Sequence, residues 1–538
     1  MRAVQDTHVQ RLSAFACIGL FALICGPLFY NSLPYLDDYY LILLQKQDGF
    51  WSPALTFQSM WGAYRIVYTT LMAPLYSLGD HLWITRCFGL VLHMINAWLL
   101  FQITRLFCWG APARWLAFAL FVFFPYSLEA VAWPSNVTQY PFAPFLVLSG
   151  VSLILTAREA TWKLLFGSVL MGFAVWVHEQ VGPLIILLLL ILIAGMPRRG
   201  RVLVSATTLA IVAANFIMIY ATRGTNQRLT GSGAGTLSNA WRNIGTAPHL
   251  LDTTPLGPYF YATAGVSSSI WFWALVVAIG ALVGYAATRR SVPRESGGVA
   301  EWKLPSSRWF WPVMGIMAAG AYAVSLVPTI MTPIPWHTGR VVYIPFIAFA
   351  LALGMFAETV SQRSRLAGAT VAVLAAVLAV WSPLALRAEV NAMTFQVKTN
   401  FGRAQSFREI LGPDATNGKA VIVVGGYLDG DTQRPLFGEH FTGMTPAEFK
   451  VALGLKMRFP PEYPLILARS NWDHICRAQD GKINLNASLF DPKTAATVAA
   501  ADSVTFVIWS QDRWVVQRPG TDPVALPKIM PSCKEVRQ

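Results

Sequence analysis

Long apolar runs separated by short polar segments dominate residues 1–385 of the chain. A helix needs about 20 residues to cross the ~30 Å hydrocarbon core of a bilayer, and each run reaches or approaches that length with few charges. The pattern therefore predicts eleven membrane-spanning helices. They are expected at residues 12–32, 84–107, 114–130, 138–157, 163–178, 181–196, 202–221, 268–288, 309–330, 341–358 and 366–385. The first run lacks the small-residue cleavage site of a signal peptide, so we expect it to be retained as a signal anchor.

The pattern changes at about residue 386, where the long apolar runs stop. The later stretches KAVIVVGGYLDG and SVTFVIWSQDRWVVQRP combine β-branched and aromatic residues with turn residues, which is typical of strands. The predicted fold is therefore an all-α polytopic membrane protein with a C-terminal mixed α/β domain. Residues 1–385 form the membrane domain, and residues 386–538 form the second domain.

The composition supports a membrane protein and indicates its orientation. Only 13% of the residues are charged and 55% are hydrophobic, whereas soluble domains are about 25% charged. Lys and Arg gather in alternate loops, with 16 in one set and 6 in the other. Cytoplasmic loops carry such an excess, so we expect a cytoplasmic N-terminus and a periplasmic C-terminal domain in a bacterial inner membrane.

The net charge of +14 lies largely in those short loops, where it fits anionic membrane lipids. No basic arm or basic helix indicates a nucleic-acid partner. Four cysteines lie in or beside predicted spans, where they are expected to be small apolar fillers. The two in the tail, Cys476 and Cys533, leave a disulfide open, because sequence does not give their separation.

Polar side chains near the spans fall on the predicted outer side. They are Asp37, Asp38, Glu129, His178, Glu179, His337 and Arg340. A charge at mid-bilayer costs at least ~2.5 kcal/mol on insertion scales, so such residues belong at interfaces, in pairs or in wet cavities. The predicted spans that flank His178 and Glu179 are only about 16 residues long, so we expect this pair below the outer surface, in a protein-lined cavity.

The adjacent acids Asp37 and Asp38 begin an outer loop, 33–83, and stand among tyrosines in LPYLDDYYLI. Repulsion between neighbouring carboxylates raises one pKa and suits that group to proton abstraction; a solvated loop start is the alternative. Arg65 and Arg340 are among the few outer cations, and a guanidinium binds phosphate in a bidentate way. Contact with lipid headgroups remains the alternative for both arginines.

The polar residues in or next to the second span have simpler expectations. His93 and Asn96 are expected to pack between helices. No compact His and Cys pattern indicates zinc, and no nucleotide-binding motif is present. A divalent cation, Mg²⁺ or Mn²⁺, at Asp37 or Asp38 stays open because carboxylates are its preferred ligands.

Several of these stretches resemble, in order, the GT-C superfamily of membrane glycosyltransferases, which take sugars from polyprenyl-phosphate carriers. LPYLDDYYLI is similar to the acidic motif of the family's first outer loop, which implies that Asp37 or Asp38 is the catalytic base or a metal contact. The segment GAYRIVYTTLMAPLYSLGDHLWITRCFGLVLHMINAWLLF resembles one with an Arg after a Tyr, here Arg65, and a later span with His93 and Asn96. The nearest branch contains bacterial multi-spanning sugar transferases and eukaryotic transmembrane-and-tetratricopeptide O-mannosyltransferases.

Three further stretches extend the resemblance over about residues 12–360. FFPYSLEAVAW resembles a family stretch that contains Glu129, with Phe124 where His is usual. HEQVGP resembles a Lys-Glu-Gln stretch, with His178 replacing Lys and Glu179 retained. HTGRVVYIPFIAFAL, which includes His337, resembles a Glu-Arg-Tyr-Leu-Tyr-Leu-Pro segment. Arg340 and Tyr343 match that segment, whereas its acid has no counterpart.

The resemblance implies an enzyme that transfers a sugar from a polyprenyl-phosphate donor to a glycan, lipid or protein acceptor. Asp37 or Asp38 would act as base, and the other matched residues would bind substrates. Two other functions remain open, a transporter or flippase for a lipid-linked or charged solute and a non-catalytic assembly protein that presents the C-terminal domain. Intramembrane carboxylates would relay protons in a transporter, although no inverted repeat is apparent.

Overall fold

The computed structural model describes most of the helical part of the chain and the strands of the C-terminal part. The described residues are 2–29, 41–42, 45, 48–61, 65–78, 81–125, 127–157, 160–222, 269–288, 304–305, 308–330, 339–411, 420–425, 465–468, 475–477, 483–485, 497–499, 504–510 and 513–517. Contacts divide the chain into two compact units, the first made of residues 1–32 and 48–392 and the second of residues 33–47 and 393–538. The first unit is helical, and the strands belong to the second.

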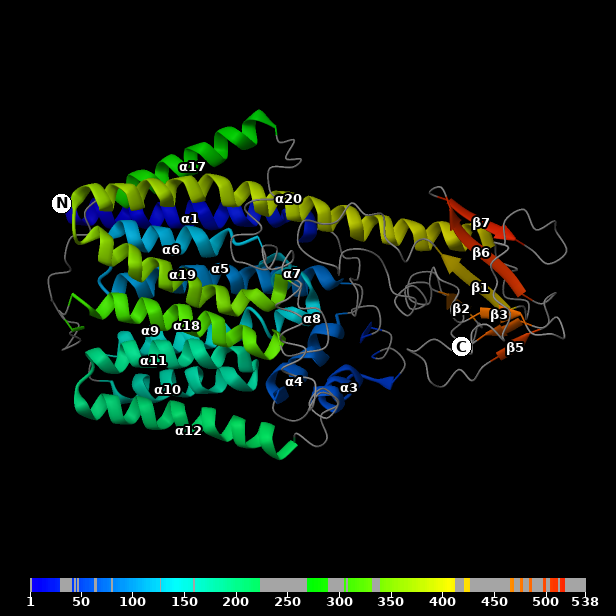
Figure 1. The fold of residues 1–538 in the computed structure, drawn as a ribbon, viewed down its shortest axis with the longest axis horizontal. Coiled ribbons are helices and arrows are strands. Elements are labelled where there is room, and N and C mark those ends of the chain that lie inside the picture. Colours follow the sequence, from blue (N-terminus) through cyan, green and yellow to red (C-terminus); the bar gives the residue numbers. More distant parts are fainter. Residues whose placement is uncertain are drawn as a thin grey trace. The chain divides into compact units, whose positions relative to one another are not determined.

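The first unit is built of helices (Figure 1). Most of them overlap the predicted apolar runs, whereas α3 and α4 lie in the predicted outer loop 33–83. They are α1 (Arg2–Phe29), α3 (Ser52–Trp61), α4 (Ile66–Tyr76), α5 (Leu82–Leu106), α6 (Ala111–Val122), α7 (Ser127–Ala132), α8 (Pro134–Val137), α9 (Phe142–Leu155), α10 (Thr161–Phe173), α11 (Gly182–Gly195), α12 (Arg198–Thr222), α17 (Ile270–Thr288), α18 (Phe310–Ile330) and α19 (Gly339–Ser361), with the short 3-10 turns η3 (Ala174–Trp176) and η4 (Glu179–Val181) between α10 and α11. The last helix, α20 (Arg365–Leu411), continues beyond Ala392.

Eight helical segments among the described residues are long and apolar enough to cross a membrane. They are His8–Phe29, Leu82–Leu106, Pro134–Leu155, Arg198–Ala221, Ile270–Thr288, Phe310–Val327, Val341–Ser361 and Arg365–Asn391. The predicted spans 114–130, 163–178 and 181–196 correspond to shorter apolar helices, Ala111–Val122, Thr161–Trp176 and Glu179–Gly195. At 1.5 Å per residue, a helix of 17 residues extends only about 26 Å, less than the hydrocarbon core.

The helices of the first unit differ in how much of their surface the protein covers. The span in α19 is 83% buried within the protein, whereas the span in α12 is 22% buried, so α19 is central and α12 is peripheral. Large apolar side chains on the peripheral helices are exposed, including Ile217, Trp271, Ile316 and Leu366. Continuous exposed apolar surface of this kind fits contact with lipid. The chain is therefore a helical membrane protein.

Helix α20 runs through the predicted domain boundary at 385/386. It has 47 residues and includes Pro383. The residues that follow Pro383 include Ala, Leu, Arg and Glu, which have high helix propensity, and no glycine occurs before Gly402. Helix α20 therefore does not end at residue 386, where the hydrophobicity falls.

The strands of the second unit form two sheets. They are β1 (Ala420–Gly425), β2 (Leu465–Ala468), β3 (Ile475–Arg477), β4 (Ile483–Leu485), β5 (Thr497–Ala499), β6 (Val504–Ser510) and β7 (Arg513–Gln517). One sheet has the order β2-β1-β6-β7, in which β1 is parallel to β2 and β6, while β7 is antiparallel to β6. The other is an antiparallel sheet of β3, β4 and β5. The stretches that the sequence marks as strands correspond to β1 and to the pair β6–β7.

Candidate functional site

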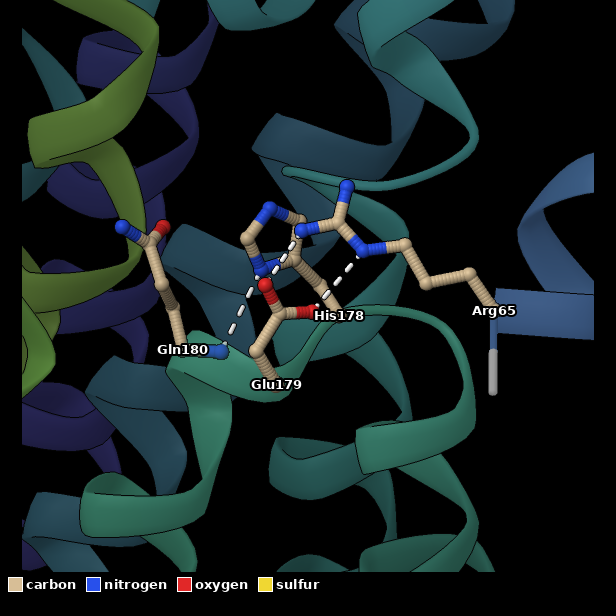
Figure 2. Close-up of polar contacts among 4 residues, drawn as sticks. All are labelled: Arg65, His178, Glu179 and Gln180. Carbon is tan, nitrogen blue, oxygen red and sulfur yellow. Dashed lines mark hydrogen bonds and ion pairs between the residues drawn. The ribbon is translucent and has the colours of Figure 1, made fainter. Parts of the chain in front are cut away.

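An ion pair joins two segments that the sequence singles out separately. Arg65 immediately precedes α4, and Glu179 begins η4. Arg65 Nε donates a hydrogen bond of 2.8 Å to Oε2 of Glu179, and Arg65 Nη2 donates to Oε1. Figure 2 shows the guanidinium facing the carboxylate in this bidentate arrangement. The predicted outer loop 33–83 and the turn between α10 and α11 therefore meet at this pair.

The pair is largely withdrawn from solvent. The side chain of Arg65 is 6% exposed and that of Glu179 is 22% exposed. Burial alone would raise the pKa of the Glu179 carboxyl, but the charge of Arg65, the neighbouring His178 and the hydrogen bonds to the carboxylate together outweigh burial, and the pKa falls to about 2. A charged carboxylate bound to a charged guanidinium is thus the state at neutral pH. Bidentate pairs of this kind fix orientation as well as charge.

His178 lies beside this ion pair and shapes the same turn. It is the N-terminal cap of η4, and its Nδ1 accepts a 3.2 Å hydrogen bond from the backbone N–H of Gln180 (Figure 2). An Nδ1 that accepts leaves the proton of a neutral ring on Nε2, a tautomer assigned from this contact. The ring packs against Tyr140, with 4.8 Å between ring centroids. His178 is 2% exposed, so protein encloses its side chain.

Glu129 lies in another buried polar region, in α7. Glu129 is 3% exposed, and its backbone carbonyl accepts a 3.3 Å hydrogen bond from Nδ2 of Asn136. The amide of Gln139 in turn donates to Oδ1 of Asn136 at 3.1 Å. Tyr140, the next residue, is the one that packs against His178. The segment after α7 therefore connects the surroundings of Glu129 with those of the ion pair.

Glu389 in α20 is a buried acid that sequence reasoning missed. It is 3% exposed. The sequence ends the last predicted span at residue 385, so Glu389 falls just outside it. Continuing the helical pattern of α20 by four residues would have placed this carboxylate in a helix.

Tyr343 ties helices together in the interior. Tyr343 is fully buried, and its hydroxyl contacts Nδ1 of His93 at 2.9 Å. The other ring nitrogen of His93, Nε2, is 3.1 Å from the backbone carbonyl of Val122 at the end of α6. Because a carbonyl only accepts, Nε2 donates and Nδ1 accepts from Tyr343. Asn96 donates to the carbonyl of Pro141 at 2.8 Å and to the Tyr343 hydroxyl at 3.5 Å. His93 and Asn96 thus pack between helices, and Tyr343 joins them there.

Arg86 is a second functional candidate that the sequence did not single out. It lies in α5, is 2% exposed, and donates from Nε to the backbone carbonyl of Ala132 at 3.0 Å. Ala132 is the last residue of α7, whose final carbonyls have no partner within the helix. Arg86 therefore fixes the end of the helix that carries Glu129.

The structure does not describe the side chains of the four remaining predicted site residues. Asp37, Asp38 and His337 lie outside the described residues, and Arg340 is described only as a backbone position in the first turn of α19. Among the described residues, no group of three or more His, Cys, Asp and Glu side chains could hold a metal ion. The predicted cation at Asp37 or Asp38 is not tested by that result. Cys17, Cys25, Cys87 and Cys108 are free thiols.

Comparison with known proteins finds no match to the chain in any family model, any curated protein or any solved structure.

Proposed function

We propose that the chain is an integral membrane glycosyltransferase of the GT-C type, which moves a sugar from a polyprenyl-phosphate carrier to an acceptor on the outer side of the membrane. The observation that carries the proposal is the ion pair between Arg65 and Glu179. These residues come from two separate stretches that resemble the family, and they are in contact although 114 residues separate them. Contact between matched residues supports a common site.

In the proposed reaction, Asp37 or Asp38 takes the proton of an acceptor hydroxyl. The hydroxyl oxygen attacks the anomeric carbon of the sugar, and the bond between that carbon and the phosphate oxygen breaks. The polyprenyl phosphate leaves with the electron pair of the broken bond. The acceptor is a glycan, a lipid or a protein. A divalent cation held by Asp37 or Asp38 would add positive charge near the leaving phosphate.

The guanidinium groups of Arg65 and Arg340 would bind the leaving phosphate. A planar guanidinium matches two phosphate oxygens, and charge aimed at the leaving group stabilises the transition state. Glu179 holds the Nε and Nη2 edge of Arg65, so it is proposed to position the guanidinium without touching substrate. His178 would shape the adjoining surface, where the donor or acceptor binds.

The proposed setting is a bacterial inner membrane with the catalytic side facing the periplasm. The three shorter apolar helices α6, α10 and α11 would complete eleven spans, because a bilayer can thin locally around helices shorter than its hydrocarbon core. The segment 386–538 would form a periplasmic α/β domain around the strands of the second unit.

A transporter or flippase for a lipid-linked or charged solute is the second candidate, and the acids Glu129 and Glu389 favour it. Both are 3% exposed inside the helical unit, and buried carboxylates in membrane proteins commonly carry protons or ions. A non-catalytic assembly role is the third candidate, and it predicts that neither these acids nor the double Asp matters.

The test is sugar transfer by the purified full-length protein in lipid, with radiolabelled sugars on a panel of polyprenyl-phosphate donors and with chelator added in parallel. The variant Asp37→Asn/Asp38→Asn should abolish transfer while the protein stays folded. Asp48→Asn is the matched control, because Asp48 is an exposed acid of the same loop, and it should leave transfer unchanged. Unchanged transfer by the double variant would refute the assignment of the base. Absence of transfer by folded wild-type protein would favour transport or assembly.

A further inference from the structure

Exposed basic side chains gather at one end of the helical unit. Helices α10, α12, α18 and α20 all begin at this end (Figure 1). The exposed basic residues there are Arg11, Arg198, Arg199, Arg201, Arg308, Arg363 and Arg365, and Lys163 is half-buried. Among the described residues, the acids at this end are Asp6 in α1 and Glu358, which is buried. The surface is therefore strongly positive.

Two of these basic residues lie over the rings of exposed tryptophans. Lys163 Nζ is 5.7 Å from the ring centroid of Trp162, and Arg308 Cζ is 5.7 Å from that of Trp309. Trp162 is 62% exposed and Trp309 is 59% exposed. Such rings are amphipathic and are enriched at the headgroup level of membranes.

Exposed apolar side chains continue from each tryptophan along its helix. On α10 they are Leu165 and Phe166, three and four residues after Trp162, and on α18 they are Val313 and Ile316, four and seven residues after Trp309. These spacings place each set on one helix face. Each face therefore begins with a cation and an indole and continues as an apolar stripe. A phospholipid has the matching order, with a charged headgroup followed by apolar acyl chains.

The helix ends add to the positive potential. No acidic residue stands in the first turn of α10, α12, α18 or α20. The N-terminal end of a helix carries partial positive charge, so basic residues at these positions repel it unless an anion lies nearby. Anionic headgroups would offset this repulsion, and neutral ones would not.

We propose that the faces starting at Trp162–Lys163 and at Arg308–Trp309 each bind one anionic phospholipid. The cation pairs with the lipid phosphate, the indole lies among the headgroups, and the acyl chains lie on the apolar stripe. This proposal is independent of the glycosyltransferase proposal, because none of its residues belongs to the candidate site.

The test is native mass spectrometry of the full-length protein released from nanodiscs of phosphatidylcholine and phosphatidylglycerol. Wild-type protein should retain phosphatidylglycerol in preference to phosphatidylcholine. Lys163→Gln and Arg308→Gln should each lower the bound ratio of the two lipids by about fivefold, because each variant loses the cation that pairs with the phosphate of the bound lipid. The charge-preserving variant Lys163→Arg/Arg308→Lys should retain the wild-type ratio.

The matched control is Arg11→Gln/Arg363→Gln, which removes two exposed charges from the same end. It should change the ratio by less than about twofold. An equal loss in this control would show diffuse charge attraction and would overturn the proposal, as would the absence of any preference in the wild type. Displacement of the lipid by millimolar inorganic phosphate would overturn it as well, because the ligand would then be a free anion.

Discussion

Arg65 and Glu179, 114 residues apart, are joined by two hydrogen bonds between one guanidinium edge and both carboxylate oxygens. Removing one partner of a buried ion pair leaves an uncompensated charge, which typically costs about 3–5 kcal/mol. We expect Glu179→Ala and Arg65→Ala each to lower the free energy of unfolding by about 3 kcal/mol, the low end of that range because Glu179 is 22% exposed. Unfolding in mixed micelles with increasing dodecyl sulfate measures the effect.

The double variant Arg65→Ala/Glu179→Ala measures the interaction energy between the two side chains apart from their interactions with other residues. It should lose much less stability than the two single variants together, since neither charge is then left without its partner. Arg199→Gln, which changes an exposed cation, should alter the free energy of unfolding by less than about 0.5 kcal/mol. Additive losses in the double variant would contradict an energetic coupling between the two side chains.

The same pair predicts a pH dependence. The pKa of Glu179 is lowered to about 2 in the folded protein, against about 4.3 for an unperturbed Glu. A lowered folded-state pKa contributes stability that is present above the unfolded pKa and is lost as pH falls towards the folded pKa. The stability difference between wild type and Glu179→Gln should therefore be constant from pH 7 to about pH 5 and should shrink between about pH 4 and pH 2. Melting temperatures of both proteins across this range test it, and a difference that stays constant down to pH 2 would contradict it.

Hydrophobic patterning predicted much of the helical unit, because a segment that crosses lipid must be a long apolar helix whose backbone N–H and C=O groups are hydrogen-bonded within the helix. Each of the predicted runs overlaps a helix among the described residues, although the run 114–130 covers the two separate helices α6 and α7. The lengths of the helices were predicted less well. Helices α10 and α11 are shorter than the predicted runs, and α20 continues for 26 residues beyond residue 385. Helix ends depend on local propensity and on tertiary contacts, and hydrophobicity does not report either of them.

The candidate site was predictable as a set of polar residues but not as a set of contacts. Arg65 and Glu179 stand out because charged residues are rare beside spans, yet nothing in the sequence gives their partnership. Tyr343 was expected to bind substrate, and the structure places its hydroxyl against His93. Glu389 was missed because its helix was expected to end earlier. Pairing across distant segments is decided by packing, which a single sequence does not reveal.

Gly89 in α5 allows a close approach to α7. A Cβ atom at this position would lie 2.2 Å from the carbonyl oxygen of Val131 and 2.7 Å from Cγ2 of Val137. Because a backbone carbonyl cannot rotate away, Gly89→Ala should separate α5 from α7 and destabilise the protein by about 1–3 kcal/mol. Gly19→Ala is the control, since a Cβ at Gly19 in α1 meets nothing within 4 Å, and it should be neutral or stabilising by up to about 1 kcal/mol. Equal behaviour of the two variants in the micelle unfolding assay would contradict the close contact.

The hydrogen bond between Tyr343 and His93 distinguishes a structural role for this tyrosine from a role in substrate binding. Tyr343→Phe removes the hydroxyl that donates to Nδ1 of His93 and leaves a buried acceptor without that donor, which should cost about 1–3 kcal/mol of unfolding free energy. The exposed Tyr285, changed to Phe, is the control and should cost less than about 0.5 kcal/mol. A structural role predicts that the folded fraction of Tyr343→Phe keeps the wild-type KM for the sugar donor. A raised KM together with unchanged stability would instead support the substrate-binding role that the sequence resemblance implies.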